Sequence, residues 1–303
     1  MKKIIAAILA LIVGSSFVFA GAGGGPRSFP LMPKDVNLLA VYGLSQRGDQ
    51  LLNTGEYFPN ADIDVNIGIV QYTRTFGVYG HLGAAFVALP YVDATGSVGG
   101  FSASNDGLGS IIVGGTIGLI GLPALSGKKF AEYNPGFQLG LVGKLFLPTG
   151  SYNSDNIINV GSNRLAGQII LPMTYVFGSS MIDPNLTTLE IQPSVTIYGD
   201  NDDPSGSASN SGQDELFTLE AHVTQSFTKS TWVSFGGIYN YGGETSTNSV
   251  WNDDRRESFG IGASVNFAAT SSTAVKVSYG ETVWRNDDGM DIKLFRILAT
   301  YAF

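Results

Sequence analysis

The sequence lacks cysteine, carries few charges and has no long apolar run after its first twenty residues. Without cysteine, an exported protein cannot depend on disulfides, so its secondary structure must hold the fold together. Charged residues make up 14% of the chain, below the roughly 25% of soluble domains, whereas hydrophobic residues make up 44%. The net charge of −8 argues against nucleic acid as a partner, because no basic face is available for phosphates.

The first twenty residues have the pattern of a secretory signal peptide. Lys2 and Lys3 form a basic start, residues 4–13 form an apolar stretch, and Val18-Phe19-Ala20 offers a cleavage position. A membrane anchor is the alternative, but the apolar stretch is shorter than the roughly 20 residues of a spanning helix. We therefore expect a signal peptide over residues 1–20, a flexible N-terminal leader over residues 21–34 and a single domain over residues 35–303.

Twelve segments after the leader show strand-like alternation or β-rich composition, and each exceeds the roughly 9–11 residues that a tilted strand needs to cross a bilayer. The segments are 35–46, 61–75, 78–92, 107–120, 134–148, 164–177, 187–199, 214–227, 231–242, 255–267, 272–284 and 291–303. Long polar connections follow the odd-numbered segments, and tight turns follow several even-numbered ones, although 121–133 and 178–186 are longer. This pattern is typical of an outer-membrane barrel with both termini on the periplasmic side.

Alternation within the segments separates an apolar face from a polar face. A soluble β-sandwich also alternates, so the aromatic residues at the segment ends decide between the two folds. They recur at the presumed periplasmic edge, as in an interfacial girdle: Phe76, Phe177, Phe227, Phe267 and Phe303. We predict an all-β fold, a transmembrane antiparallel β-barrel of outer-membrane type with about 12 strands. A break in the alternation near residues 69–71 predicts a β-bulge there.

The last segment ends on Phe303, with apolar residues at alternate positions before it. It resembles the terminal-Phe signal by which outer-membrane barrels are recognised for insertion. The expected partners are therefore outer-membrane lipid and lipopolysaccharide, the barrel assembly machinery through the C-terminal strand, and small organic solutes, with no nucleic acid.

The stretch from Phe146 to Arg164 reads FLPTGSYNSDNIINVGSNR. It resembles the Pro-x-Gly-x-Tyr and Asn-x-Gly-x-Asn-Arg stretch of the outer-membrane transporter family named after the MetA pathway of phenol degradation. The resemblance implies an outer-membrane barrel that passes small organic, often aromatic, compounds. Pro148 lacks an N–H for the sheet, and Gly150 and Gly161 suit a folded loop. This loop either stays outside the barrel or folds inward to narrow the pore.

Polar residues of the predicted strands form a candidate lumen or constriction. The candidates are Asp64, Asn66, Arg74, His81, Lys144, Glu190, Gln192, Glu220, His222, Lys276 and Arg296. A charge facing lipid costs about 2–4 kcal/mol at mid-membrane, which favours an inward placement for all of them. Strand order places Lys276 and Arg296 near Asp64, and Glu190 beside Glu220 or His222. The set is either a structural network or a polar constriction that orders a solute between opposite charges.

Part of the lumen is expected to be apolar, through Leu39, Val87, Leu89, Phe146, Ile170, Trp232 and Ile238. The leader is too short for a folded plug, although its apolar residues 29–33 could enter the lumen. These features predict a passive channel for small, hydrophobic or aromatic molecules. A structural or adhesive barrel with a sealed lumen is the alternative.

No enzyme signature supports catalysis, and the sequence predicts no cofactor and no metal. It contains neither a Gly-x-Ser-x-Gly elbow nor a His-Glu-x-x-His motif. A lipid hydrolase is a remote alternative, because Thr224 and Ser226 share the polar face of His222. Acidic loops, such as the one around Asp202 and Asp203, could bind divalent cations with lipopolysaccharide, but a solvated loop surface explains them equally simply.

Overall fold

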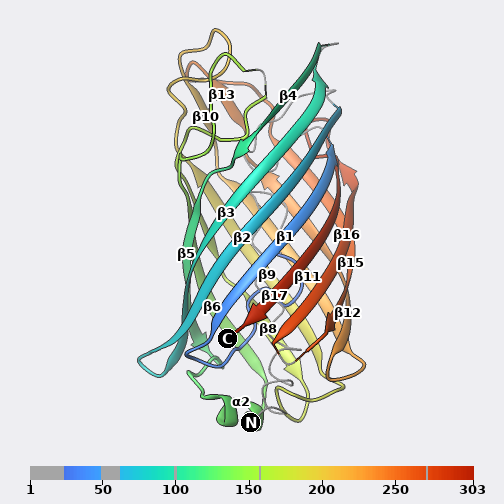
Figure 1. Ribbon diagram of the computed structural model, residues 1–303. Helices are drawn as coiled ribbons and strands as arrows, with labels where there is room; N and C mark the ends of the chain where they lie inside the picture. Colours follow the sequence, from blue (N-terminus) through green and yellow to red (C-terminus); the bar gives the residue numbers. More distant parts are fainter. Residues whose placement is uncertain (1–23, 49–61, 99–100, 157, 271) are drawn as a thin grey trace.

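Twelve antiparallel strands form the wall of a closed barrel in the computed structural model, which describes residues 24–48, 62–98, 101–156, 158–270 and 272–303 (Figure 1). The wall consists of β1 (Asn37–Gly48), β2 (Asp62–Val78), β3 (His81–Val98), β5 (Ile112–Ile120), β6 (Phe137–Phe146), β7 (Ala166–Ile170) continued by β8 (Met173–Phe177), β9 (Thr187–Tyr198), β11 (Leu216–Ser226), β12 (Thr231–Gly242), β15 (Arg256–Ala268), β16 (Thr273–Arg285) and β17 (Ile292–Ala302). The last strand closes on the first, with register pairs from Leu38↔Ala302 to Gly48↔Ile292. The predicted fold class is confirmed.

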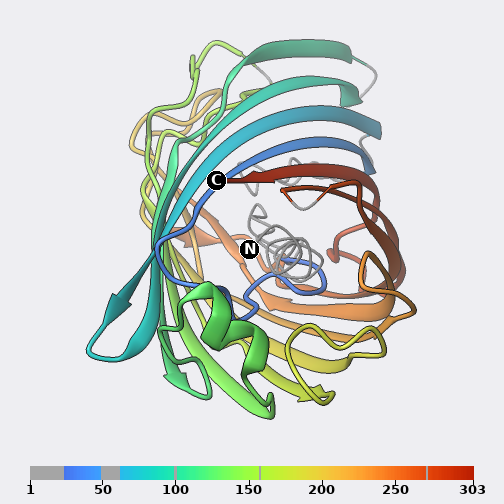
Figure 2. The same cartoon turned by 60° about the horizontal axis from the view of Figure 1, so that its bottom comes forward.

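The remaining elements lie at the two ends of the barrel (Figure 1). At one end, β4 (Phe101–Leu108) pairs antiparallel with the second half of β3, and β10 (Ser211–Gln213), β13 (Thr245–Thr247) and β14 (Val250–Trp251) form a small sheet. At the other end of the barrel, where the C-terminus also lies, α2 (Gly127–Glu132) is near the lower opening (Figure 2). Among the described residues, no helix is long and apolar enough to cross a membrane.

A proline divides the sixth strand of the wall without opening it. Pro172 separates β7 from β8, because proline has no N–H to donate to a neighbouring strand. Its carbonyl still accepts a hydrogen bond from the Gly140 N–H (3.0 Å), and the Leu171 N–H donates to the Pro193 carbonyl (3.0 Å). Both neighbours therefore stay joined across the break.

The β-bulge expected near residues 69–71 is not there. The registers of β1 with β2 and of β2 with β3 run without a shift. Ile69 and Gln71 both face the interior, so the change from apolar to polar residues marks a change in the chemistry of the lumen and not a change of phase. Among the described strands, register shifts occur instead at Phe259/Gly260 and at Gly118/Ile120.

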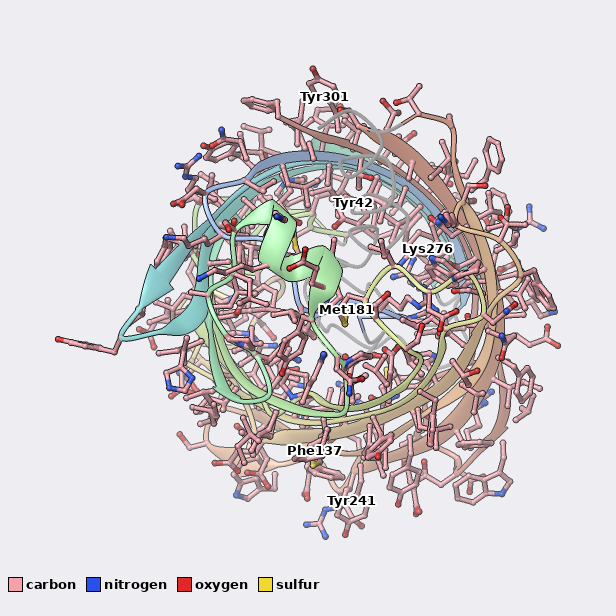
Figure 3. All side chains as sticks on the ribbon, turned by 90° about the horizontal axis from the view of Figure 1, so that it is seen from below. Tyr42, Phe137, Met181, Tyr241, Lys276 and Tyr301 are labelled. Atoms are coloured by element: carbon pink, nitrogen blue, oxygen red, sulfur yellow. The ribbon has the colours of Figure 1, made fainter. Side chains whose placement is uncertain are left out.

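Side chains alternate between the interior and the outer surface along the wall. Figure 3 shows Tyr42, Met181 and Lys276 inside the barrel, and Phe137, Tyr241 and Tyr301 pointing away from it. Phe177, Phe227, Phe267 and Phe303 are exposed on the outer face where their strands end, and Phe76 lies half-buried near the β2–β3 turn. An outer face of exposed apolar and aromatic side chains suits contact with lipid.

Candidate functional site: the lumen

The N-terminal segment, residues 24–33, lies inside the lower part of the barrel. The Gly25 N–H donates to Oε1 of Glu220 (2.6 Å), and the Arg27 N–H donates to Oε2 of Glu190 (2.8 Å). Leu31 and Met32 are buried. The leader is therefore not a free tail over these residues, and its apolar part enters the lumen, as its composition allowed.

Below these contacts, an apolar seal surrounds the N-terminal segment. It consists of Leu31, Met32, Leu122, Phe130, Met181 and Leu186, which belong to one buried cluster. Phe130 comes from α2, and Met181 and Leu186 come from the connection between β8 and β9. Among the connections at this end of the barrel, residues 121–133 and 178–186 are the two that the sequence shows to be longer than a tight turn. Their extra length provides the side chains that pack on the N-terminal segment.

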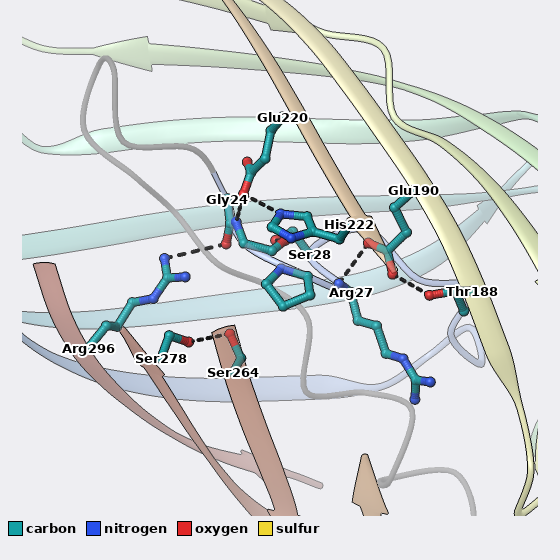
Figure 4. A network of polar contacts seen from close by, with 12 residues as sticks. Gly24, Arg27, Ser28, Thr188, Glu190, Glu220, His222, Ser264, Ser278 and Arg296 are labelled. Carbon is teal, nitrogen blue, oxygen red and sulfur yellow. Dashed lines mark hydrogen bonds and ion pairs between the residues drawn. The ribbon is translucent and has the colours of Figure 1, made fainter. Parts of the chain in front are cut away.

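Arg27 anchors the segment to the polar wall of the lumen (Figure 4). Its Nε donates to Oγ1 of Thr224 (2.9 Å), and its Nη2 donates to Oγ of Ser226 (3.1 Å). Its guanidinium lies 4.8 Å from the ring centroid of Trp232. Burial lowers the pKa of Arg27 to about 10, although the Glu190 carboxylate opposes this shift, so the side chain remains charged at neutral pH.

Above Arg27, a group of charged side chains surrounds the start of the segment. Nε2 of His222 lies 2.6 Å from Oε1 of Glu220, the oxygen that also accepts from Gly25. Nζ of Lys276 donates to the Pro26 carbonyl (3.0 Å). Arg296 reaches the Gly24 carbonyl through Nη1 at 3.5 Å. A Cβ on Gly25, whose φ is +80°, would meet the Arg296 guanidinium, so glycine permits this close approach.

Buried charges of the described residues are mostly positive, although the whole chain is acidic. The cations are Arg27, Lys144, Arg164, Arg256, Lys276 and Arg296, and the carboxylates are Glu190 and Glu220. Six cations against two carboxylates leave a formal surplus of positive charge in the interior of a protein whose net charge is −8. By this formal count, the buried charged residues differ in sign from the chain as a whole.

The loop between β6 and β7 folds toward the interior. Ile158 and Val160 belong to the same buried cluster as the inward residues of β1 and β2. Nδ2 of Asn159 donates to the Asn153 carbonyl (3.0 Å) and to Oγ of Ser205 (2.9 Å), which fixes the loop shape. Of the two placements considered for this loop, the structure supports the inward one.

Seven of the sequence-predicted lumen residues lie inside the barrel: Lys144, Glu190, Gln192, Glu220, His222, Lys276 and Arg296. Register pairs join His222 to Glu190 and Glu220 to Gln192, so β9 and β11 bring four of them together. Lys144 lies within electrostatic reach of Glu220.

Four predicted lumen residues do not face the lumen: Asp64, Asn66, Arg74 and His81. Nε of Arg47 donates to Oδ1 of Asp64 on the outer surface (2.7 Å), so Asp64 is not a neighbour of Lys276 or Arg296. His81 is exposed at the β2–β3 turn. The strand β2 is longer than a bilayer crossing requires, so its ends can carry polar residues outward without contact with the hydrocarbon core.

The expected apolar lumen residues also divide. Leu39, Val87 and Leu89 face outward, whereas Phe146, Ile170 and Trp232 are buried inside and Ile238 is half-buried on the inner face. The interior of the first strands is apolar through other residues, namely Ala40, Tyr42, Leu44, Ile63, Val65, Ile67 and Ile69. We call this surface the apolar wall.

Arg27 was not among the sequence candidates, although it is central to the site. A signal for it does exist, because Arg27 is the only charged residue between Ala20 and Lys34. An isolated cation in an otherwise uncharged stretch, next to a lumen with two inward glutamates, would point to a partner inside the barrel. No group of three or more His, Asp or Glu residues that could hold a metal ion occurs in the described part of the chain.

Residues 47–287 match the family model described as "Putative MetA-pathway of phenol degradation". No match was found among the curated proteins. The outer-membrane channel COG4313 from Pseudomonas putida F1 has a similar fold, with a TM-score of 0.75, 19% identity, and coverage of 92% of this chain and 99% of that chain. The β domain of the Bordetella autotransporter BrkA gives a TM-score of 0.53 at 14% identity, covering 88% of this chain and 98% of that chain. At these identities the solved structures support the barrel fold alone.

Proposed function

Because the chain belongs to this family of the MetA pathway of phenol degradation, and because its lumen contains room beside a short internal segment, we propose that it is an outer-membrane channel for passive passage of small organic molecules. The signal-like N-terminus and the lipid-suited outer face support export to the outer membrane. We also propose that the protein contacts lipopolysaccharide and that the barrel assembly machinery binds its C-terminal strand, which leads to Phe303.

The observation that carries the proposal is open space on both sides of the N-terminal segment. A chamber with about 110 Å³ of free volume lies beside Gly25 and Arg296, and a second space of about 50 Å³ lies beside Phe29 and the inward residues of β2, β3 and β5. A barrel that served only as a structural element would gain stability by filling such space with side chains.

The N-terminal segment is held in the lower part of the lumen by packing and hydrogen bonds, so it can leave without breaking a covalent bond. The N-terminal segment is joined to the wall at residue 34 and otherwise held by side chains. In the proposed mechanism, it withdraws toward the periplasm and a solute passes along the space that it leaves. The charged residues Glu190, Glu220, Lys276 and Arg296 form the charged wall of the lumen, on β9, β11, β16 and β17. In the proposed mechanism, the ring of an aromatic solute contacts the apolar wall while its polar group contacts the charged wall.

The hydroxyls near His222 do not support the hydrolase alternative. Thr224 and Ser226 both accept hydrogen bonds from Arg27, and Thr224 is also 2.7 Å from the Thr188 hydroxyl. Among the described residues, no hydrogen bond joins either hydroxyl to His222. The Nε2 atom of His222 instead contacts Oε1 of Glu220 at 2.6 Å. A nucleophile requires a base within hydrogen-bonding distance.

Solute flux into liposomes tests the channel directly. Purified protein that shows heat-modifiable migration on gels would be reconstituted and exposed to phenol, benzyl alcohol, short fatty acids and sugars, with protein-free liposomes as the control. We expect faster uptake of the aromatic solutes than of sugars of similar mass. A correctly folded barrel that passes none of these solutes, with or without residues 24–33, would contradict the proposal.

A further inference from the structure

Part of the lining of the chamber beside Arg296 consists of glycines and therefore of bare backbone. Gly262 and Gly280 pair in register across β15 and β16, on the inner face of the barrel, and both line the chamber together with Gly260. A Cβ on Gly262 would come within 2.8 Å of the Tyr279 carbonyl, and a Cβ on Gly280 would come within 3.1 Å of the Ile261 carbonyl. The glycines therefore leave a flat surface of backbone against which a planar group can lie.

Arg296 stands at the edge of this flat surface and has unused donor capacity. Its side chain is only 5% exposed, and its Nε has no hydrogen-bond partner among the described residues. Its one hydrogen bond to a described residue, from Nη1 to the Gly24 carbonyl, is long at 3.5 Å. A buried guanidinium with free donors is expensive unless it meets an acceptor, and a carboxylate matches its fork geometry.

The other charged groups around Arg296 allow an anion to bind. Glu220 is the carboxylate in electrostatic reach of Arg296, and it is already bound by His222 and by the Gly25 N–H. Lys276 lies within electrostatic reach of Arg296, and its Nζ donates to the Pro26 carbonyl. The surplus of buried cations described above acts in the same direction.

Apolar residues complete the chamber. Met290 and Ile292 are buried, and Leu294 and Ile238 are half-buried, on the same lining as the flat glycine surface. A ligand with a carboxylate at one end and a flat apolar body therefore finds a guanidinium, an uncrowded backbone surface and aliphatic side chains in one space. These contacts match an aromatic carboxylate better than a neutral aromatic or a sugar.

We propose that this chamber is a binding site for small organic carboxylates, whose carboxylate is held by Arg296 and whose apolar body lies on the glycine surface. The proposal deepens the proposed function, because it names the chemical class of solute that the lumen prefers. It also stands as a statement about binding that does not require flux.

Calorimetric titration of the protein in a neutral detergent tests the proposal with benzoate and benzamide, which share shape and differ in charge. The wild type should bind benzoate at least about tenfold more tightly than benzamide. In Arg296→Gln this preference should vanish, with benzamide binding unchanged. The control Arg47→Gln removes a positive charge from the outer surface and should keep the preference.

A second variant, Ser258→Phe, places a ring into the chamber from its lining and should abolish binding of both ligands in a heat-modifiable barrel. It keeps the proposal testable if Arg296→Gln fails to fold. Equal binding of benzoate and benzamide to the wild type, an unchanged preference in Arg296→Gln, or full binding in Ser258→Phe would overturn the carboxylate site. Benzoate binding without any solute flux would instead contradict the channel and leave the site standing.

Discussion

The two walls of the lumen differ in chemistry, although the same kind of strand builds both. From Ala40 to Leu44 on β1 and from Ile63 to Ile69 on β2 the inward residues are aliphatic or aromatic. Their outward neighbours are also largely apolar in the middle of the strands. On β9, β11, β16 and β17 the inward residues include Glu190, Glu220, Lys276 and Arg296. The lipid around a barrel requires apolar residues only on the outer face. The inward residues are not constrained in this way, so one side of the lumen can serve a function while the other serves packing.

The largest difference between the walls should appear when the same carboxylate is placed on each. Ile67→Asp buries a charge among Ile63, Val65 and Ile69 and should lower the free energy of unfolding by about 3 kcal/mol or more. Ser278→Asp places it directly across from Arg296 in the register and should remain within about 1 kcal/mol of the wild type. Urea unfolding in lipid vesicles measures both, and equal losses would show that the walls do not differ.

Removal of the Arg27 side chain should weaken the hold of the polar wall on the N-terminal segment. Arg27→Ala loses the hydrogen bonds to Thr224 and Ser226 and removes a cation that lies within electrostatic reach of Glu190. We expect a loss of about 3 kcal/mol, which corresponds to about a hundredfold shift toward the open state. Single-channel recording should show longer or more frequent openings. Lys34→Ala, which removes an exposed charge at the end of the segment, should leave the openings unchanged.

Truncation within the apolar seal should have a smaller effect of the same sign. Leu31→Ala removes a fully buried side chain that packs with Phe130 and Met181, at a cost of about 2 kcal/mol to the closed state. Its openings should therefore be rarer than those of Arg27→Ala and commoner than those of the wild type. The opposite order would mean that the apolar seal, and not the charged wall, is the main hold on the segment.

The smallest expected effect is on Asp183, a carboxylate outside the lumen that accepts hydrogen bonds from uncharged donors. Hydrogen bonds from the N–H groups of Ser179 and Asn185 and from the Ser179 hydroxyl keep the pKa of Asp183 below its ordinary value of 3.8. A lowered pKa in the folded state stabilises the loop above pH 3.8, and this stabilisation disappears as the pH falls through the folded pKa. The amide signals of Ser179 and Asn185 should titrate with a midpoint below 3.8. Asp183→Asn should remove that titration, and a midpoint at or above 3.8 would contradict the geometry.

The barrel was predictable from the sequence because each strand repeats one signal. Twelve alternating segments coincide with the twelve strands of the wall, and the break at Pro172 still falls within one expected segment. The charged wall was also predictable, since Glu190, Glu220 and Arg296 alternate with plainly apolar neighbours.

The apolar wall was not predictable in the same way. Where both faces of a strand are apolar, as around Ile69 and Val70, alternation does not show which residues face inward. The prediction therefore placed the polar residues Asp64 and Arg74 in the lumen, which is wrong. Asp64 and Arg74 lie on the outer face because of the register in which β2 pairs with β1 and β3. This register cannot be deduced from the sequence of β2 alone. The lower closure depends on contacts between Leu31, Phe130 and Met181, which lie far apart in the sequence.

The central claim is that the N-terminal segment, and not the wall, closes the lumen. Planar-bilayer conductance of a variant lacking residues 24–33 tests it most directly, beside the wild type and a deletion of equal length in the connection between β1 and β2. We predict a stable, several-fold larger conductance for the first deletion only, in a barrel that keeps its heat-modifiable migration. A folded barrel that lacks residues 24–33 and conducts no more than the wild type would contradict the account.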